Sequence, residues 1–171
     1  CKCGFFPDLG KCRCTPTQIR RYLNRVSGPF LDRIDIGVEV PRQDLGMMAA
    51  EKSIDEGSFP QTEQRNSSAV MRARVMEARA RQEKRFADES ISYNSQMTRR
   101  QIEEYCRLSG EEAVFLEKVE RQQGISARGH GKILKVARTL ADLDGQAEIG
   151  RTQLAEAIGF RSFEKKYWGS L

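Results

Sequence analysis

The sequence is short of histidine and of long apolar runs. One histidine, His130, occurs in 171 residues, so a Ser-His or Cys-His catalytic pair has almost no material. No apolar run is close to the length of a membrane span, which is about 18 residues. The chain starts at Cys1, without a methionine or the charged and apolar regions of a secretory signal. We therefore expect no membrane partner, and a piece of a longer polypeptide.

The glycine-rich loops that hold nucleotides are also missing. Gly131 and Lys132 match the end of a G-x-x-x-x-G-K-[ST] phosphate loop, but that motif requires glycine at position 126 and serine or threonine at position 133. The sequence has Ser126 and Ile133 there, and it contains no G-x-G-x-x-G. We expect this chain alone neither to bind ATP tightly nor to hydrolyse it. For His130 the pattern predicts an exposed polar side chain at the start of a helix.

Composition predicts a folded protein of one large domain or two small ones. Apolar residues make up 39% and charged residues 31%, and 29 Lys and Arg oppose 24 Asp and Glu for a formal net charge of +5. This apolar share exceeds that of a disordered, highly charged tail.

Four of the five cysteines cluster at the start of the chain. Cys1, Cys3, Cys12 and Cys14 form the pattern C-x-C-x8-C-x-C. A secreted disulfide framework would spread its cysteines to close long loops, whereas adjacent thiolates repel each other unless a soft cation such as zinc neutralises them. A structural zinc site is the favoured interpretation, with reduced thiols and disulfides as alternatives. The remote Cys106 is predicted to be a small core residue.

The first forty residues predict a helix and then a strand. Thr15 and Pro16 supply an N-cap and a first-turn proline, and the helix runs through Leu23 until Ser-Gly-Pro at 27–29 ends it. Apolar residues alternate with others over 34–40, which is the two-residue period of a strand. No period persists over residues 43–66, which we interpret as a linker.

After residue 66 the sequence predicts helices throughout. Expected N-caps are Ser67 or Ser68, Thr98, Ser109 in a capping box with Glu112, and Ser126, which begins a helix over 127–143. The predicted apolar faces comprise Met71, Val75, Ala78 and Phe86, then Ile102, Tyr105 and Cys106, then Ala113, Leu116 and Val119, and finally Ile133, Leu134, Ala137, Leu140 and Ala141. A last helix is expected near 152–158, followed by an aromatic tail.

These elements predict a mainly α protein in three parts. Residues 1–42 form the end of an α/β core, with one strand and a cysteine-rich loop. Residues 43–66 form the linker, and residues 67–171 form a helical domain. One strand cannot make a sheet, so its partners are expected upstream of the chain.

Two groups of basic residues are candidates for anion contact. Arg128, Lys132 and Lys135 share one helix face at spacings of three and four. The other group is opposed only by Glu77 and Glu83, and a solvated surface is favoured for it over nucleic-acid contact. Its members are Arg72, Arg74, Arg79, Arg81, Lys84 and Arg85.

Several blocks of the sequence resemble one family. They are CKCG at 1–4, CRCTPTQIRRY at 12–22, SGPFLDRIDIGVEV at 27–40, the helix block SARGHGKILKVARTLADL at 126–143 and LAEAIGFR at 154–161. Together they resemble the magnesium-chelatase-like AAA+ ATPases of the ComM/YifB type. The resemblance covers nearly the whole chain and is weakest over 43–66.

The resemblance implies an AAA+ core and a helical lid, in a cytoplasmic ATPase that binds ATP and Mg²⁺ at the interfaces of a homo-oligomeric, typically hexameric ring. Arg33 would be the arginine finger, which reaches the ATP of the neighbouring subunit in trans. Arg128 would be the second-sensor arginine, which contacts the γ-phosphate of its own subunit's ATP. Asp32 and Asp35 would orient Arg33 or pair with surface cations. The paired cysteines also match the family.

Three functions remain open at this point. The favoured one is a motor that remodels or translocates on DNA, as in branch migration during natural transformation. The second is a zinc-stapled helical DNA-binding module without ATPase activity. The third is the motor subunit of a true metal chelatase acting on a tetrapyrrole partner.

Overall fold

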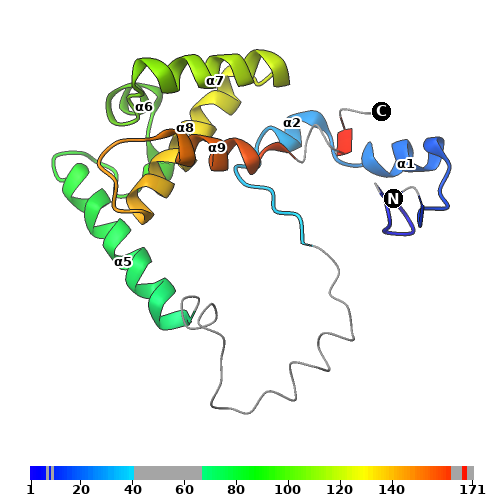
Figure 1. Ribbon diagram of the computed structural model, residues 1–171, viewed down its shortest axis with the longest axis horizontal. Coiled ribbons are helices and arrows are strands. Elements are labelled where there is room, and N and C mark those ends of the chain that lie inside the picture. The colour runs from blue at the N-terminus through cyan, green and yellow to red at the C-terminus, as the bar shows by residue number, and fades with distance from the viewer. Residues whose placement is uncertain (7, 9, 41–66, 163–166, 169–171) are drawn as a thin grey trace, which may run out of the picture.

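The computed structural model describes residues 1–6, 8, 10–40, 67–162 and 167–168. Within these residues the architecture is helical, which confirms the mainly α fold class (Figure 1). The predicted linker over 43–66 lies outside the described residues. None of the helices described is both long and apolar enough to cross a bilayer.

Helix α8 (Ala127–Leu143) is the centre of the molecule. It packs against α9 (Arg151–Gly159), α5 (Ser68–Arg85), α6 (Arg99–Tyr105) and the short 3-10 helix η1 (Asn94–Gln96), and α7 (Gly110–Gln123) packs on α9 (Figure 1). The bounds of α8 are those that its serine cap and apolar period predict. The helices predicted after residue 66 are therefore present over the described residues.

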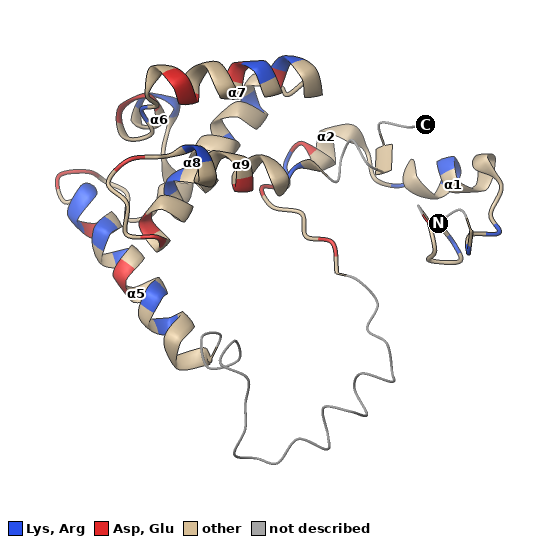
Figure 2. Cartoon of the chain, in the orientation of Figure 1, with Lys and Arg blue, Asp and Glu red and all other residues tan. Residues whose placement is uncertain are grey.

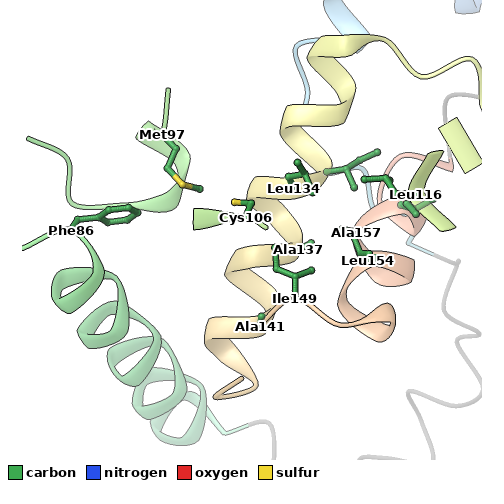
Figure 3. Close-up of a cluster of buried hydrophobic side chains, with 12 residues drawn as sticks. Phe86, Met97, Cys106, Leu116, Leu134, Ala137, Ala141, Ile149, Leu154 and Ala157 are labelled. Carbon is green, nitrogen blue, oxygen red and sulfur yellow. The ribbon is translucent and has the colours of Figure 1, made fainter. Parts of the chain in front are cut away.

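The core fills the space between α8 and its neighbours. Ile133, Ala137 and Ala141 lie at intervals of four on one face of α8 and are buried. Cys106 is buried among them, as predicted, and this burial raises the pKa of its thiol to about 11. The buried apolar set, drawn in Figure 3, is Phe86, Met97, Cys106, Leu116, Ile133, Leu134, Ala137, Ala141, Ile149, Leu154, Ala157 and Ile158.

Four of the five predicted N-caps are confirmed, and the fifth, Ser109, lacks the predicted side-chain bond. The side chains of Thr15, Ser67, Thr98 and Ser126 each accept a hydrogen bond from a backbone N–H in the first turn of the helix that follows. Ser109 precedes α7 but donates its hydroxyl to the Glu112 carboxylate and makes no such bond.

The predicted strand over 34–40 is not present in the described part of the chain. The segment is extended, but its Gly37 N–H donates to Phe160 O, 2.9 Å away, at the end of α9. Ile36, Val38 and Val40 are 48%, 69% and 83% exposed. A strand requires a neighbour along its backbone, and no described segment supplies one.

A short helix that the sequence did not predict follows α1 (Pro16–Leu23). Residues 27–29 end the region of α1, as predicted, but they also begin α2 (Gly28–Leu31). The Ser27 side chain accepts from the N–H of Phe30, and Pro29 lies in the first turn, where its missing N–H costs nothing.

The buried residues of α5 all lie in its C-terminal half. Of its predicted apolar face, Ala78 and the C-cap Phe86 are buried, whereas Met71 and Val75 are exposed because the N-terminal half extends past α8 (Figure 1).

An ion-pair network joins α5 to α8. The Arg85 guanidinium binds both carboxylate oxygens of the fully buried Asp142. Asp142 also accepts from the Asn94 amide and pairs with Arg138. Burial lowers the pKa of Arg138, whose guanidinium donates to the carbonyls of residues 146 and 147. Buried charges are tolerated when paired and hydrogen-bonded in this way.

Candidate nucleotide site and cysteine cluster

Arg33 lies directly after α2, in the turn that closes this helix. Its N–H donates to Phe30 O at 2.9 Å and its Nη1 to Pro29 O at 2.6 Å. The side chain is exposed. The turn thus fixes the base of the arginine, while the guanidinium keeps donors for an incoming anion.

Arg128 lies in the first turn of α8. Its side chain is 58% exposed, and its Nε lies 3.9 Å from Asp32 Oδ2. The preceding cap residue, Ser126, accepts from Gly129 N–H at 3.0 Å and donates its hydroxyl to Asp32 Oδ1 at 3.0 Å. The start of α8 is therefore held against the residue next to Arg33.

Asp32 and Asp35 pair with cations of the helical domain. Asp32 Oδ1 lies 3.7 Å from Arg161 Nη2, in addition to its contacts with Ser126 and Arg128. Asp35 Oδ1 lies 2.7 Å from Lys132 Nζ. Of the two roles that the sequence predicted for these carboxylates, the observed contacts match cation pairing.

Arg161 is a residue of this site that sequence reasoning missed. It is 7% exposed, and its Nη1 donates to Ile34 O at 3.0 Å. The guanidinium thereby holds the backbone and the carboxylate on both sides of Arg33. No local pattern marks this role, because Arg161 and Ile34 lie 127 positions apart.

Arg33 and Arg128 line one cavity of about 660 Å³, which is within the size range of ligand pockets. Lys132 and Lys135 also line it, whereas Asp35 is the one carboxylate among its lining residues. Lys135 Nζ is held by Ser95 O at 2.9 Å. The lining of this cavity therefore carries four cationic side chains and one carboxylate.

The glycine after Arg128 is required by close packing. A Cβ at Gly129 would lie 2.8 Å from Ile125 Cγ2, so the start of α8 could not approach the preceding residues with alanine there. His130 is half-buried and its Nδ1 lies 2.7 Å from Glu120 Oε1. The side chain stays 45% exposed, close to the expectation, but the sequence did not predict its partner on α7, ten residues back.

The four N-terminal cysteines converge as a metal site requires. The Sγ atoms of Cys1 and Cys3 are 3.2 Å apart, those of Cys3 and Cys12 3.5 Å, and those of Cys1 and Cys12 3.6 Å. The Sγ atoms of all four cysteines, Cys14 included, lie within 4.8 Å of one another. Four ligands at the 2.3 Å Zn–S distance would be about 3.8 Å apart in a tetrahedron. The residues present therefore fit a zinc ion.

Backbone groups shape the cysteine cluster. Gly4 has a φ of +76°, the left-handed conformation that glycine adopts freely, and its N–H donates to Cys1 O at 3.0 Å. A hydrogen bond from the backbone of Phe5 lowers the pKa of Cys3 to about 7, against an opposing effect of burial. The pKa of Cys12 is raised. A hydrogen bond with the backbone of Cys14 lowers this pKa, but burial and the neighbouring Cys3 together raise it by more. One thiol of the cluster is thus poised to ionise near neutral pH.

Comparison with known proteins gives two family matches. The family described as magnesium chelatase, subunit ChlI C-terminal, matches residues 65–161, and magnesium chelatase, subunit ChlI, matches residues 1–48. The competence protein ComM of Haemophilus influenzae is 40% identical over 151 residues, which are 88% of this chain and 27% of that protein. The YifB protein of Escherichia coli is 40% identical over 153 residues, which are 90% of this chain and 28% of that protein.

The C-terminal family model covers more than half of the chain. The chain therefore belongs to the magnesium chelatase ChlI family, which is of the AAA+ ATPase type. Within that family it is of the ComM/YifB type. It spans just over a quarter of the length of these relatives, at 27% and 28%.

Replacing Arg161 with alanine should loosen the segment that carries Arg33. We expect the amide of Gly37, which donates to Phe160 O, to exchange with solvent about tenfold faster or more, because the charged hydrogen bonds beside it are lost. Hydrogen exchange of the complete gene product measures this. Arg100→Ala, an exposed arginine of α6, is the control. Unchanged exchange at Gly37 would contradict the role given to Arg161.

Proposed function

We propose that this chain supplies Arg33 and Arg128 to the hydrolysis of one ATP molecule, held by a neighbouring subunit of a homo-oligomeric ring. The observation that carries the proposal is that both arginines line the same cavity. They are also joined through adjacent residues, because Asp32 precedes Arg33 and lies beside Arg128.

The chemistry of phosphoryl transfer calls for such a pair. Charge in the transition state spreads over the γ-phosphate oxygens, and a planar guanidinium neutralises it while donating in two directions. The phosphate loop and the Mg²⁺ ligands of this reaction come from outside the present sequence, which contains no phosphate loop. In this proposal, Arg33 and Arg128 bind and orient the γ-phosphate from the side opposite the phosphate loop.

A nucleotide shared by Arg33 and Arg128 differs from the role that the sequence predicted for Arg128. That expectation has Arg33 acting in trans and Arg128 acting in cis. Two arginines that serve nucleotides at opposite faces of a subunit would lie apart, whereas these two line a common hollow. This geometry favours Arg128 acting in trans together with Arg33.

Substitution in the complete gene product tests the pair. Arg33→Ala should reduce ATP hydrolysis by about 10³-fold or more with little effect on ATP binding, because the lost charge acts on the transition state. Arg128→Ala should also reduce hydrolysis. When either variant is mixed with subunits whose phosphate loop is inactivated, some activity should return, because mixed interfaces pair an intact loop with both arginines. Steady-state hydrolysis in mixing series measures this, with Lys118→Ala as the control.

The outcomes separate the alternatives. Rescue of Arg33→Ala without rescue of Arg128→Ala would return Arg128 to the cis assignment. If neither substitution changed turnover, the arginines would have no part in hydrolysis. If the complete gene product did not hydrolyse ATP at all, the non-ATPase DNA-binding module would be the better account.

DNA is the substrate on which this motor acts in our proposal, and a hexamer is its expected assembly. The support is the similarity to a protein named for competence and the net positive charge of the chain.

A structural zinc ion is the second part of the proposal. Cys1, Cys3, Cys12 and Cys14 would hold it, and when bound it would neutralise their thiolates and fix the loop that leads into α1. The sulfur distances and the backbone bonds to the thiols support this assignment over disulfides, whose sulfurs are about 2.05 Å apart.

Metal analysis tests the zinc site. The complete gene product purified without chelator should contain one equivalent of zinc per chain, and the double variant Cys12→Ser with Cys14→Ser should lose it. Cys106→Ala should keep it, since Cys106 lies in the lid core. Zinc-free wild-type protein under reducing conditions would leave a cluster of reduced thiols instead.

A further inference from the structure

Positive charge is concentrated in the first 25 residues. They contain six basic side chains against one acidic residue, Asp8, which gives a net charge of +5, equal to that of the whole chain. Residues 67–171, by contrast, contain 19 basic and 15 acidic side chains. The six basic residues are Lys2, Lys11, Arg13, Arg20, Arg21 and Arg25.

Two of these arginines, Arg20 and Arg21, lie on α1, and Arg25 follows its C-cap Asn24 and lines the same surface, here called the α1 face. Thr17, Arg20, Arg21, Asn24 and Arg25 follow the helical spacing of three and four, are all exposed, and line a hollow of about 360 Å³. The apolar residues of α1, Ile19 and Leu23, are buried on the other side. The lining thus has three guanidiniums and no carboxylate among its described residues.

We propose that this face of α1 binds the phosphate backbone of nucleic acid. The inference rests on the proposed action on DNA and adds the place of contact. It is separate from the cavity of Arg33 and Arg128, which α8 and the segment after α2 line.

The side chains of the face match a phosphate backbone. Arginine presents a planar fork of donors that fits a phosphate in two-point fashion, and Thr and Asn side chains commonly bond phosphate oxygens. From Thr17 to Leu23, where α1 ends, the helical rise is about 9 Å, comparable with about three phosphates of one DNA strand at 3.4 Å of axis each, and Arg25 lies just beyond. Complementing the helix dipole would explain Arg20 and Arg21 but not Thr17, Asn24 and Arg25.

The same face is a poor fit for a lipid surface. A helix that lies on a membrane inserts an exposed apolar side, and α1 buries Ile19 and Leu23. Tyr22, at 42% exposed, is the one large hydrophobic residue that α1 offers to solvent.

Helix α1 is held at both ends. Cys14 of the cysteine cluster comes directly before Thr15, whose side chain and backbone complete a capping box with Gln18 at 3.3 Å and 3.0 Å. At the other end, Trp168 Nε1 donates to Leu23 O at 3.2 Å. The arginines therefore project from a fixed element, which lowers the entropic cost of ordering them on a ligand.

The basic residues of α5 are less suited to this role. Arg85 binds the buried Asp142, and Arg74 lies 3.8 Å from Asp144. Helix α5 also lies at the opposite end of the molecule from α1 (Figure 1; charges in Figure 2). It therefore provides a matched control surface.

The test is binding of a fluorescein-labelled DNA duplex of mixed sequence by the complete gene product with a non-hydrolysable ATP analogue. Replacing Arg20, Arg21 and Arg25 with glutamine should weaken binding about tenfold or more, and should reduce the slope of log K against log salt by about 2.7, one phosphate contact for each arginine. The matched variant, with Arg72, Arg79 and Lys84 replaced by glutamine, removes the same charge and should change the slope by less than about 1. ATP hydrolysis without DNA should be unchanged in both.

Each outcome bears on the proposal. Wild-type protein that fails to bind the duplex would overturn both the action on DNA and this inference. If wild-type protein binds and the α1 variant binds equally well, or if both variants weaken binding equally, only the α1 inference falls. Charge-conserving Arg→Lys replacement at the three positions should keep most of the salt slope, which separates loss of charge from loss of folding. Poly-glutamate and phosphatidylserine vesicles are tested as alternative partners. If the α1 variant lost binding to one of these and not to the duplex, the nucleic-acid assignment would be overturned.

Discussion

The buried Arg161 guanidinium joins the two parts of this chain. It donates to the carbonyl of Ile34 and lies beside Asp32, while the adjacent Phe160 accepts from Gly37. The contacts of Asp32 and Asp35 with Ser126, Arg128 and Lys132 also hold this segment on α8. A buried arginine bonded to a carbonyl is costly to leave unpaired, so the joint favours a single arrangement. The shared cavity depends on that arrangement.

Much of the helical domain could be predicted from sequence, because its signals are local. The serine cap and the apolar period of residues 126–143 gave the bounds of α8, and the same kind of signal located α5, α6 and α7. The predicted strand at 34–40 failed because alternation reports two faces but not a neighbouring strand. Helix α2 was missed because Gly28 and Pro29 end one helix and begin another.

The candidate site was predictable in its residues but not in its geometry. Arg33, Arg128 and the four cysteines came from spacing and family resemblance. Their arrangement depends on Arg161, which is remote in sequence from the segment it holds. Glu120 escaped notice for a similar reason, since the turn between α7 and α8 brings it to His130. The concentration of arginines on α1 became visible once the burial of Ile19 and Leu23 fixed which side of this helix faces solvent.

The central claim is that one subunit offers both arginines to one nucleotide. The most direct measurement is a structure of the assembled complete gene product with ADP and aluminium fluoride, which mimics the transferring phosphate. The account predicts that the guanidiniums of Arg33 and Arg128 from one subunit both lie within about 3 Å of the same aluminium fluoride group, on the nucleotide of the neighbouring subunit. Arg128 bound to the nucleotide of its own subunit, with Arg33 on that of the neighbour, would contradict it.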